Sequence, residues 1–215
     1  MKPKNIIIWR HAQSEGNANR EIYATVPDHQ INITALGHAQ AAEQITNIKG
    51  ILGDSKVALY CSPFARARQT AEYAKKYLNI VRYDEDPRIT EQSWGNFRKI
   101  TDTWEIEKTR DLYGPFFYRF PDGESVADVY HRVASFIDTL HRHFRAEDFP
   151  ENCVIVSHGM TIRAFIMAWF SKSVEEWQTW KNPRNCEFHV LEKQVDYKYK
   201  LLTQFKTRGP QDHIG

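Results

Sequence analysis

Short apolar runs alternate along the chain with stretches in which apolar residues recur every three or four positions. The runs at residues 6–9, 57–61 and 153–156 are almost free of polar side chains, as expected for strands that are buried on both faces of a sheet. Apolar residues recur at helical spacing over residues 35–49 and 125–145, which indicates amphipathic helices. Strands that alternate with helices predict an α/β fold.

Caps, turns and shorter runs predict the remaining elements. Thr34 precedes the first long helix as its N-cap, Pro63 suits the first turn of the next helix, and Ser173 fits a capping box. The further helices expected are residues 63–78, residues 159–170 and a short helix after residue 173, and the further strands are residues 81–83, 187–191 and 197–202.

Residues 91–120 differ from the rest of the chain. Aromatic and charged residues crowd there, and Gly95, Gly114 and Pro115 interrupt any long element. We expect this stretch to be an insertion with helical pieces that lies over another part of the protein. Beyond residue 209, a glycine followed by a proline predicts a loose tail.

The composition is that of an ordinary globular protein, and a single domain over residues 1–215 is the expectation. Lys and Arg number 29 against 27 Asp and Glu, so the formal net charge is +2, which argues against a general nucleic-acid binder. No apolar run approaches the roughly 20 residues of a membrane helix, and the N-terminus lacks a secretory signal pattern. The three widely spaced cysteines favour free thiols in a reducing cytoplasm.

Two of the predicted strands run into a histidine. Arg10 and His11 follow the first strand, His158 follows a later one, and Arg66 lies in the helix after a third. Because the carboxyl ends of parallel strands meet at one edge of a sheet, we expect these side chains to lie close together. Two arginine forks and one imidazolium would hold a phosphoryl group, and the other histidine would attack phosphorus. Glu91 is a candidate general acid for the leaving alkoxide.

Four motifs in this order resemble the signature of the histidine phosphatase (phosphoglycerate mutase-like) superfamily. They are residues 10–17, residues 62–71, Glu91 within residues 88–92, and residues 157–159. The resemblance extends over most of the chain. It implies a three-layer αβα fold with a mostly parallel central sheet and a lid insertion at about residues 91–124.

The resemblance also implies a role for each matched residue. His11 would be the nucleophile that becomes phosphorylated, and Glu91 would be the proton donor and later the base that activates water. The residues that would hold the phosphoryl group are Arg10, Asn17, Arg66, His158 and Gly159. Ala12 stands where the superfamily usually has glycine. Because alanine tolerates a positive φ poorly, we expect an ordinary backbone conformation there.

The insertion distinguishes the branches of the superfamily. The mutases typically carry a tyrosine three residues after the acid and a pair of arginines in the insertion, whereas this chain has Trp94 and the single Arg119. Residues 91–97, 117–125 and 182–187 resemble instead the broad-range acid phosphatases. The resemblance therefore implies hydrolysis of phosphate monoesters through a phosphohistidine on His11, without metal or cofactor. Arg119 is the candidate for a substrate contact in the lid.

The aromatic residues of the insertion have two interpretations. They could line the mouth of a substrate site, or they could pack the lid against the domain. We expect packing, because aromatic side chains mostly bury area. The residues concerned are Trp94, Phe97, Phe116, Phe117 and Tyr118.

Three alternatives stay open. A phosphoglycerate mutase shares the catalytic residues and would use 2,3-bisphosphoglycerate as its cofactor. A non-catalytic phosphate-binding interaction domain is expected to have lost residues such as His11 or Glu91, which this chain keeps. A metal enzyme is disfavoured, because the nine histidines form no HExxH motif and no Asp-rich loop occurs. The expected partner is a small phosphorylated substrate, with neither nucleic acid nor membrane; the substrate itself and the oligomeric state stay open.

Overall fold

A computed structural model of the chain describes residues 3–96 and 100–209. Its centre is a six-stranded sheet with the strand order β3-β2-β4-β1-β5-β6. Neighbouring strands are parallel from β3 to β1, whereas β5 is antiparallel to β1 and β6 is antiparallel to β5. The strands are β1 (Asn5–Arg10), β2 (Lys56–Cys61), β3 (Asn79–Glu85), β4 (Asn152–Ser157), β5 (Phe188–Lys193) and β6 (Tyr199–Leu201). The predicted α/β fold with a mostly parallel sheet is confirmed.

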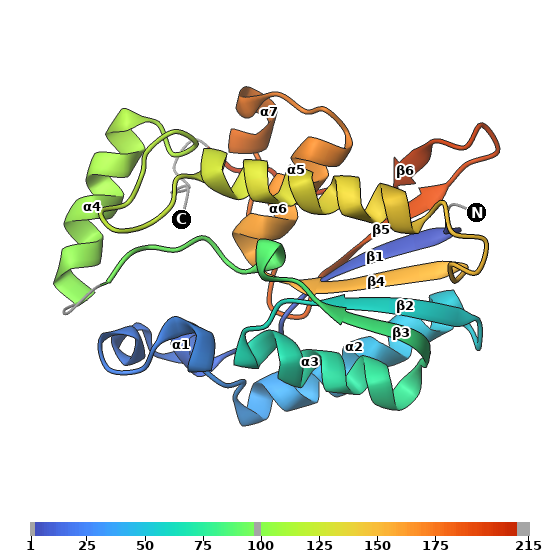
Figure 1. Cartoon of the computed structure of the whole chain (residues 1–215). Coiled ribbons are helices and arrows are strands. Elements are labelled where there is room, and N and C mark those ends of the chain that lie inside the picture. The colour runs from blue at the N-terminus through green and yellow to red at the C-terminus, as the bar shows by residue number, and fades with distance from the viewer. Residues whose placement is uncertain (1–2, 97–99, 210–215) are drawn as a thin grey trace.

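Helices cover both faces of the sheet (Figure 1). On one face lie α5 (Val126–His143) and α6 (Gly159–Trp169), and on the other lie α2 (Ala35–Leu52) and α3 (Ala65–Tyr77). Strand β1 serves both layers, because successive side chains of a strand point to opposite faces.

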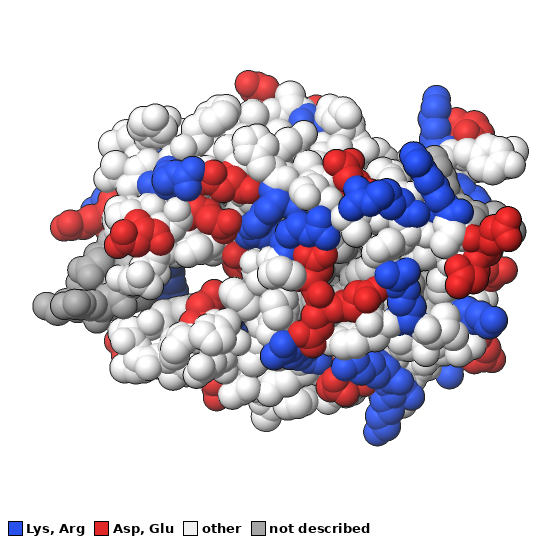
Figure 2. Space-filling model, in the orientation of Figure 1, with Lys and Arg blue, Asp and Glu red and all other residues white. Residues whose placement is uncertain are grey.

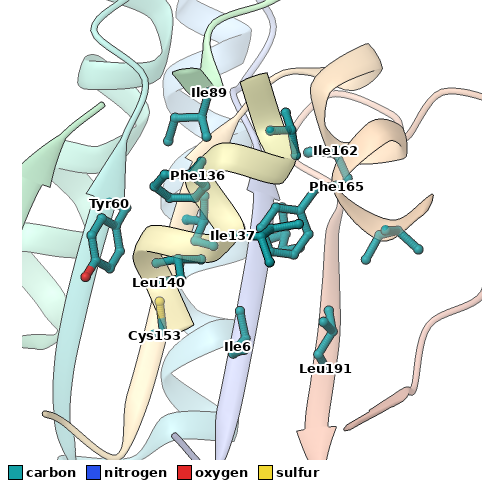
Figure 3. Close-up of a cluster of buried hydrophobic side chains, with 14 of the residues drawn as sticks. Ile6, Tyr60, Ile89, Phe136, Ile137, Leu140, Cys153, Ile162, Phe165 and Leu191 are labelled. Atoms are coloured by element: carbon teal, nitrogen blue, oxygen red, sulfur yellow. The ribbon is translucent and has the colours of Figure 1, made fainter. Parts of the chain in front are cut away.

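Each helical layer encloses its own group of buried apolar side chains. Ile6 and Ile8 of β1 join the cluster beneath α5 and α6, which Figure 3 shows around Phe136 and Phe165. Ile7 joins the cluster beneath α2 and α3. All of these side chains are at most 1% exposed, which explains why residues 6–9 of β1 are apolar without alternation.

The helix termini follow the local signals in the sequence, with one exception. The Thr34 hydroxyl accepts a hydrogen bond from the Gly37 amide at 3.0 Å and caps α2. Ser125 and Asp128 form a capping box at the start of α5. The prediction of Pro63 within the first helical turn was wrong: α3 begins at Ala65, so the proline lies in the loop before the helix. The predicted capping box before the short helix α7 (Val174–Gln178) is confirmed.

Short helical segments between β1 and α2 were not expected. They are α1 (Glu15–Ala18) and the 3₁₀ segments Arg20–Ala24 and Asp28–Gln30. A further 3₁₀ segment, Pro87–Ile89, follows β3. None of these segments is long enough to show an apolar period, which is the signal on which the prediction of the long helices depends.

The insertion after β3 forms a lid that contains α4 (Ile100–Tyr113). Figure 1 shows α4 beyond the carboxyl ends of the parallel strands, opposite α1. Arg20, beside α1, forms an ion pair with Glu107 of α4 at 2.8 Å. Figure 2 shows the surface hollowed between the part that carries α4 and the part that carries α1. The predicted lid with a helical piece therefore lies over the strand ends.

The ends of the lid are joined to each other by hydrogen bonds. The Ser93 amide donates to the Glu124 carboxylate at 2.9 Å, and the Glu124 amide donates to the Ser93 carbonyl at 2.8 Å. The side-chain amide of Gln92 also donates to the Glu124 carbonyl at 2.8 Å. We call these three residues the neck of the lid.

The predicted loose tail, from residue 210 on, lies outside the described residues. Among residues 3–96 and 100–209, none of the helices combines the length and the hydropathy that a membrane-spanning helix needs.

Candidate active site

Two histidines meet at the carboxyl ends of adjacent strands. Arg10 and Ser157 are paired in the β1–β4 register, so the residues that follow them, His11 and His158, emerge side by side. The His11 amide donates to the Ser157 carbonyl at 2.9 Å. The two rings are almost completely buried, and their centroids lie 5.0 Å apart. The structure thus brings these two histidines together, as predicted.

Hydrogen bonds orient both rings. His11 Nδ1 lies 2.7 Å from the Ala12 carbonyl oxygen. Because a carbonyl only accepts, Nδ1 carries the hydrogen and the lone pair is left on Nε2. His158 Nε2 lies 2.7 Å from the Ser62 hydroxyl, whereas its Nδ1 is buried without a protein partner. Ala12 does not have a positive φ, which confirms the expected backbone conformation.

Burial and nearby arginines keep both histidines neutral. Burial is the largest cause that lowers the pKa of His11 well below its usual value, and the positive charges of Arg66 and Arg10 lower it further. The pKa of His158 is lowered in the same direction, again by burial first and by Arg66 next. A neutral imidazole is the form that can act as a nucleophile. The expectation of one imidazolium concerns the site with a phosphoryl group bound, and it stays a prediction.

Arg66 projects from α3 into the same place. It is almost fully buried, and its guanidinium forms an ion pair with Asp28 at 2.7 Å. Nη1 also donates to the Asp28 carbonyl at 2.7 Å. The guanidinium lies over the Phe64 ring at 5.0 Å, and that ring meets His158 edge-on at 5.1 Å. Arg66 is thus held beside both histidines.

Arg10 is the second arginine of the site. Its Nη1 donates to the Pro183 carbonyl at 2.5 Å, while its Nε is buried without a protein partner. Burial lowers the pKa of Arg10, and the negative charge of Glu91 opposes that effect. A Cβ atom on Gly159 would lie 3.6 Å from Nε of Arg10, so the main chain at the start of α6 passes close to the guanidinium. A buried donor of this kind needs an acceptor, and a phosphoryl oxygen would supply one.

Glu91 lies at the N-terminus of α6. Its carboxylate accepts hydrogen bonds from the amides of Met160 and Thr161, each at 3.3 Å, and from the Gln92 amide at 3.1 Å. Arg132 of α5 donates to the Glu91 carbonyl at 3.1 Å and fixes the main chain there. The candidate acid is therefore held in one position.

Asn17 lies in α1, next to the loop that carries His11. Its side-chain oxygen accepts hydrogen bonds from the Ser14 main-chain amide, from the Ser14 hydroxyl and from the side-chain amide of Asn185. Asn185 belongs to the segment before β5, whose neighbouring residue Cys186 donates its amide to the His11 carbonyl at 3.2 Å. Asn17 is thus connected to the same loops that hold Arg10 and His11.

Arg119 does not join this group. Its side chain is 61% exposed and forms an ion pair with Asp128 at 2.6 Å, at the start of α5. No contact given by the structure connects Arg119 with His11, Arg10 or Arg66. The expected substrate contact in the lid stays a prediction, and the observed partner of Arg119 is a helix-capping carboxylate.

The lid aromatics are mainly packed, as expected. Trp94 stacks on Phe120 with ring centroids 4.7 Å apart, and buried Phe116 meets Trp177 at 5.4 Å. Tyr118 packs edge-on against Phe120 at 5.7 Å. Phe117 is 61% exposed, and Phe97 lies outside the described residues.

Two neighbours of the site were missed in the sequence. The ring of Tyr23 lies against Gly16, where a Cβ atom would be 2.6 Å from its hydroxyl oxygen. Burial raises the pKa of Tyr23, and the charges that also act on it include Arg66, Asp28 and Glu91, which places its hydroxyl among the site residues. Asp28 is the second. Neither residue belongs to a periodic pattern or a recognised motif, so no local signal could have identified them.

The described residues include no group of three or more His, Cys, Asp or Glu side chains that could hold a metal ion. All three cysteines, Cys61, Cys153 and Cys186, are free and buried. The site is therefore composed of two neutral imidazoles, two guanidinium groups and one carboxylate. This set can bind a phosphoryl group, attack its phosphorus atom and move one proton.

The fold and this set of residues define a histidine phosphatase. The sequence model of the histidine phosphatase superfamily (branch 1) matches residues 6–203, so the chain belongs to that superfamily. The prediction of a phosphatase enzyme of this class is confirmed.

Two curated relatives cover most of the chain. It is 40% identical over 210 residues to a phosphoglycerate mutase-like protein of Arabidopsis thaliana, a match that covers 89% of this chain and 75% of the relative. It is 29% identical to the broad-range acid phosphatase of Saccharomyces cerevisiae, with 89% of this chain and 86% of the relative covered.

A solved structure shares the fold. A mycobacterial glucosyl-3-phosphoglycerate phosphatase superposes with a TM-score of 0.73 at 19% identity, over 93% of this chain and 97% of the other. At this level of identity the likeness concerns the fold alone.

Proposed function

We propose that the protein hydrolyses phosphate monoesters through a covalent phosphohistidine on His11, without a metal ion. The observation that carries this proposal is the orientation of His11: its Nδ1 hydrogen is bound to the Ala12 carbonyl, so Nε2 presents a lone pair beside two arginines. The name of the yeast relative, a broad-range acid phosphatase, supports hydrolysis.

In the first step, Arg10, Arg66 and His158 bind the oxygens of the substrate's phosphoryl group. The Nε2 lone pair of His11 forms a bond to phosphorus while the bond from phosphorus to the alkoxide breaks. Glu91, in its protonated form, gives its proton to the leaving oxygen. The Ala12 carbonyl stabilises the positive charge that develops on the His11 ring, because it accepts the Nδ1 hydrogen.

In the second step, the Glu91 carboxylate takes a proton from water. The water oxygen bonds to phosphorus and the bond from phosphorus to Nε2 breaks, which returns the lone pair to His11 and releases inorganic phosphate. Glu91 ends in its protonated form, so the cycle closes without a metal ion, a reductant or a further co-reactant.

The phosphoryl dianion also changes the charge state of the site. Burial and Arg66 keep His158 neutral, but a bound dianion favours the imidazolium form of a neighbouring histidine. The expected imidazolium therefore arises at His158 together with the phosphoryl group. In that form Nδ1, which is buried without a protein partner, carries a hydrogen that a phosphoryl oxygen can accept.

Phosphoglycerate mutase activity, with 2,3-bisphosphoglycerate as cofactor, is the second candidate, and the name of the Arabidopsis relative favours it. The composition of the lid argues for hydrolysis instead. A mutase must bind the rest of its substrate in the lid to retain the intermediate, and this chain has Trp94 and the single Arg119 where the mutases typically carry a tyrosine and a pair of arginines. The free thiols support a reducing compartment such as the cytoplasm.

The test is phosphorylation and turnover with p-nitrophenyl phosphate. The wild-type protein is expected to release phosphate, to keep its activity after treatment with EDTA, and to carry a phosphoryl group on His11 when the reaction is quenched. His11→Ala should neither label nor turn over, whereas His131→Ala, which replaces an exposed histidine, should do both. Full turnover by His11→Ala would refute the mechanism. Isomerisation of 3-phosphoglycerate without free phosphate would favour the mutase.

A further inference from the structure

The segment 182–186, which precedes β5, touches the site at several points. The Pro183 carbonyl accepts from Arg10 Nη1 at 2.5 Å, and the Cys186 amide donates to the His11 carbonyl at 3.2 Å. The proposed chemistry uses no side chain of this segment.

The clearest contact is made by Asn185. Its side-chain nitrogen donates to the side-chain oxygen of Asn17 at 2.7 Å. That oxygen also faces the Ser14 amide at 3.1 Å and the Ser14 hydroxyl at 3.0 Å. A backbone amide is always a donor, so the Asn17 side chain must present its oxygen to this side. Three donors thus surround one acceptor.

This arrangement determines where the other end of the Asn17 amide points. With its oxygen engaged by Ser14 and Asn185, the NH₂ group faces away from both and keeps its two hydrogens for another acceptor. Phosphoryl oxygens are acceptors only, and hydrogen bonds to charged oxygens are stronger than neutral ones. An Asn17 side chain turned the opposite way would repel a phosphoryl group.

The backbone next to Asn185 is itself in a costly conformation. Cys186 has a φ of 60°, in the left-handed region that a non-glycine residue adopts only at a cost in free energy. The indole of Trp9 donates to the Cys186 carbonyl at 2.9 Å and so helps to hold this conformation. The main chain directly after Asn185 is therefore held in one conformation.

We propose that Asn185 is a positioning residue of the phosphate site. It holds the side-chain oxygen of Asn17 and thereby directs the NH₂ group of Asn17 at a phosphoryl oxygen. The inference rests on the proposed function, since it assigns a task to Asn17 within the same site. Asn185 itself does not touch the phosphoryl group.

The test measures direct binding of inorganic phosphate by calorimetry, which does not depend on turnover. Asn185→Leu removes the donor, and we expect the Kd to rise about three- to tenfold, which corresponds to the net free energy of one hydrogen bond between neutral groups. In an Asn17→Ala background the same substitution should leave the Kd unchanged, because Asn185 acts through Asn17. In the wild-type background, KM for p-nitrophenyl phosphate should rise with the Kd while kcat changes by less than about twofold.

A second variant keeps the shape of the side chain. Asn185→Asp places a carboxylate opposite the Asn17 oxygen and should weaken phosphate binding more than Asn185→Leu does. Arg184→Gln is its control, because this exposed neighbour changes the charge of the segment by the same unit without touching Asn17. If Asn185→Leu fails to fold, the comparison of Asn185→Asp with Arg184→Gln carries the test.

The outcomes are distinct. An unchanged Kd in Asn185→Leu, or an equal loss with and without Asn17, would overturn the positioning role. Equal weakening by Asn185→Asp and Arg184→Gln would overturn it too, since charge alone would explain the effect. A wild-type protein that binds no phosphate would refute the proposed function and this role with it. Turnover by His11→Ala with the expected Kd pattern would refute only the phosphohistidine.

Discussion

The ion pair between Asp28 and Arg66 places a carboxylate against the arginine proposed to hold the phosphoryl group. Arg66 Nη1 donates to Oδ1 of Asp28 at 2.7 Å, and Nη2 donates to Oδ2 at 3.3 Å. A phosphoryl group that binds to the end of this fork must displace the carboxylate or share its donors. We therefore expect Asp28→Asn to bind inorganic phosphate more tightly than the wild-type protein does.

The size of the effect follows from the exposure of the two partners. The Arg66 side chain is 3% exposed, but that of Asp28 is 37% exposed, so water weakens the pair. Surface ion pairs contribute up to about 1 kcal/mol. Removing a competitor of about that strength should lower the Kd for phosphate about fivefold. The Asp28 carbonyl, 2.7 Å from Nη1, stays in the variant and continues to orient Arg66.

The assay is calorimetric titration with inorganic phosphate at neutral pH, repeated with a control that loses the same charge elsewhere. Asp54→Asn is suitable, because Asp54 is 97% exposed and lies just before β2, at the opposite end of the strand from Arg66. We expect its Kd to match that of the wild-type protein. A higher Kd in Asp28→Asn would refute the reasoning and would mean that the carboxylate positions Arg66 for phosphate instead of competing with it.

Three further predictions concern stability and the lid. Gly37→Ala should lower the free energy of unfolding by about 1–3 kcal/mol, because its Cβ would collide with the Gln13 carbonyl. In the same helix, the Cβ of Gly50→Ala meets nothing, and this variant should raise the free energy of unfolding by about 0.5–1 kcal/mol. Urea unfolding in which both variants shift the free energy in the same direction would contradict this reasoning. Burial lowers the pKa of His158 in the folded protein, so below about pH 6.5 the unfolded chain binds more protons and stability falls as the pH falls, by at most about 1.4 kcal/mol per pH unit from this residue. Urea titrations across that range should show a shallower fall for His158→Asn, and an unchanged slope would be evidence against a neutral buried ring. Gly95 has a φ of 89°, and a Cβ added there would collide with the Pro121 carbonyl. Gly95→Ala should therefore speed proteolysis within the lid. Proteolysis of this variant at the wild-type rate would contradict the expected strain.

The layers of the fold were predictable because their signals are local. An apolar run such as residues 153–156 has only one favourable place in an α/β protein, the centre of the sheet. The apolar stripe of α5 determines which side of that helix is buried, and Val129, Val133 and Phe136 are all fully buried as the spacing requires. Pro63 was placed wrongly because a proline suits both a first helical turn and the loop before it.

The candidate site was predictable to the extent that strand ends determine it. Arg10 is the last residue of β1, and His11 and His158 directly follow β1 and β4, so the sheet brings them together. The ion pair of Arg66 with Asp28 and the hydrogen bond of Asn185 with Asn17 depend on loops that meet across 38 and 168 positions of the sequence. No local pattern encodes such contacts.

The contact partner of Arg119 could not be predicted from the sequence either. An exposed arginine in an insertion can reach several partners, and the sequence does not tell which of them it contacts. In the structure it pairs with Asp128, nine positions further along the chain. That contact arises because the capping box of α5 places a carboxylate within reach.

The neck of the lid has a consequence for how such a protein can diversify. Gln92 and Ser93 are hydrogen-bonded to Glu124, so the chain leaves the domain and returns to it at nearly the same point. Glu91 lies just outside this closure and is held by α6. The sequence between the two sides of the neck can therefore change in length and composition while the acid keeps its place. The lid sequence can therefore be exchanged as a unit, so that the substrate preference can change while the residues at the strand ends stay the same.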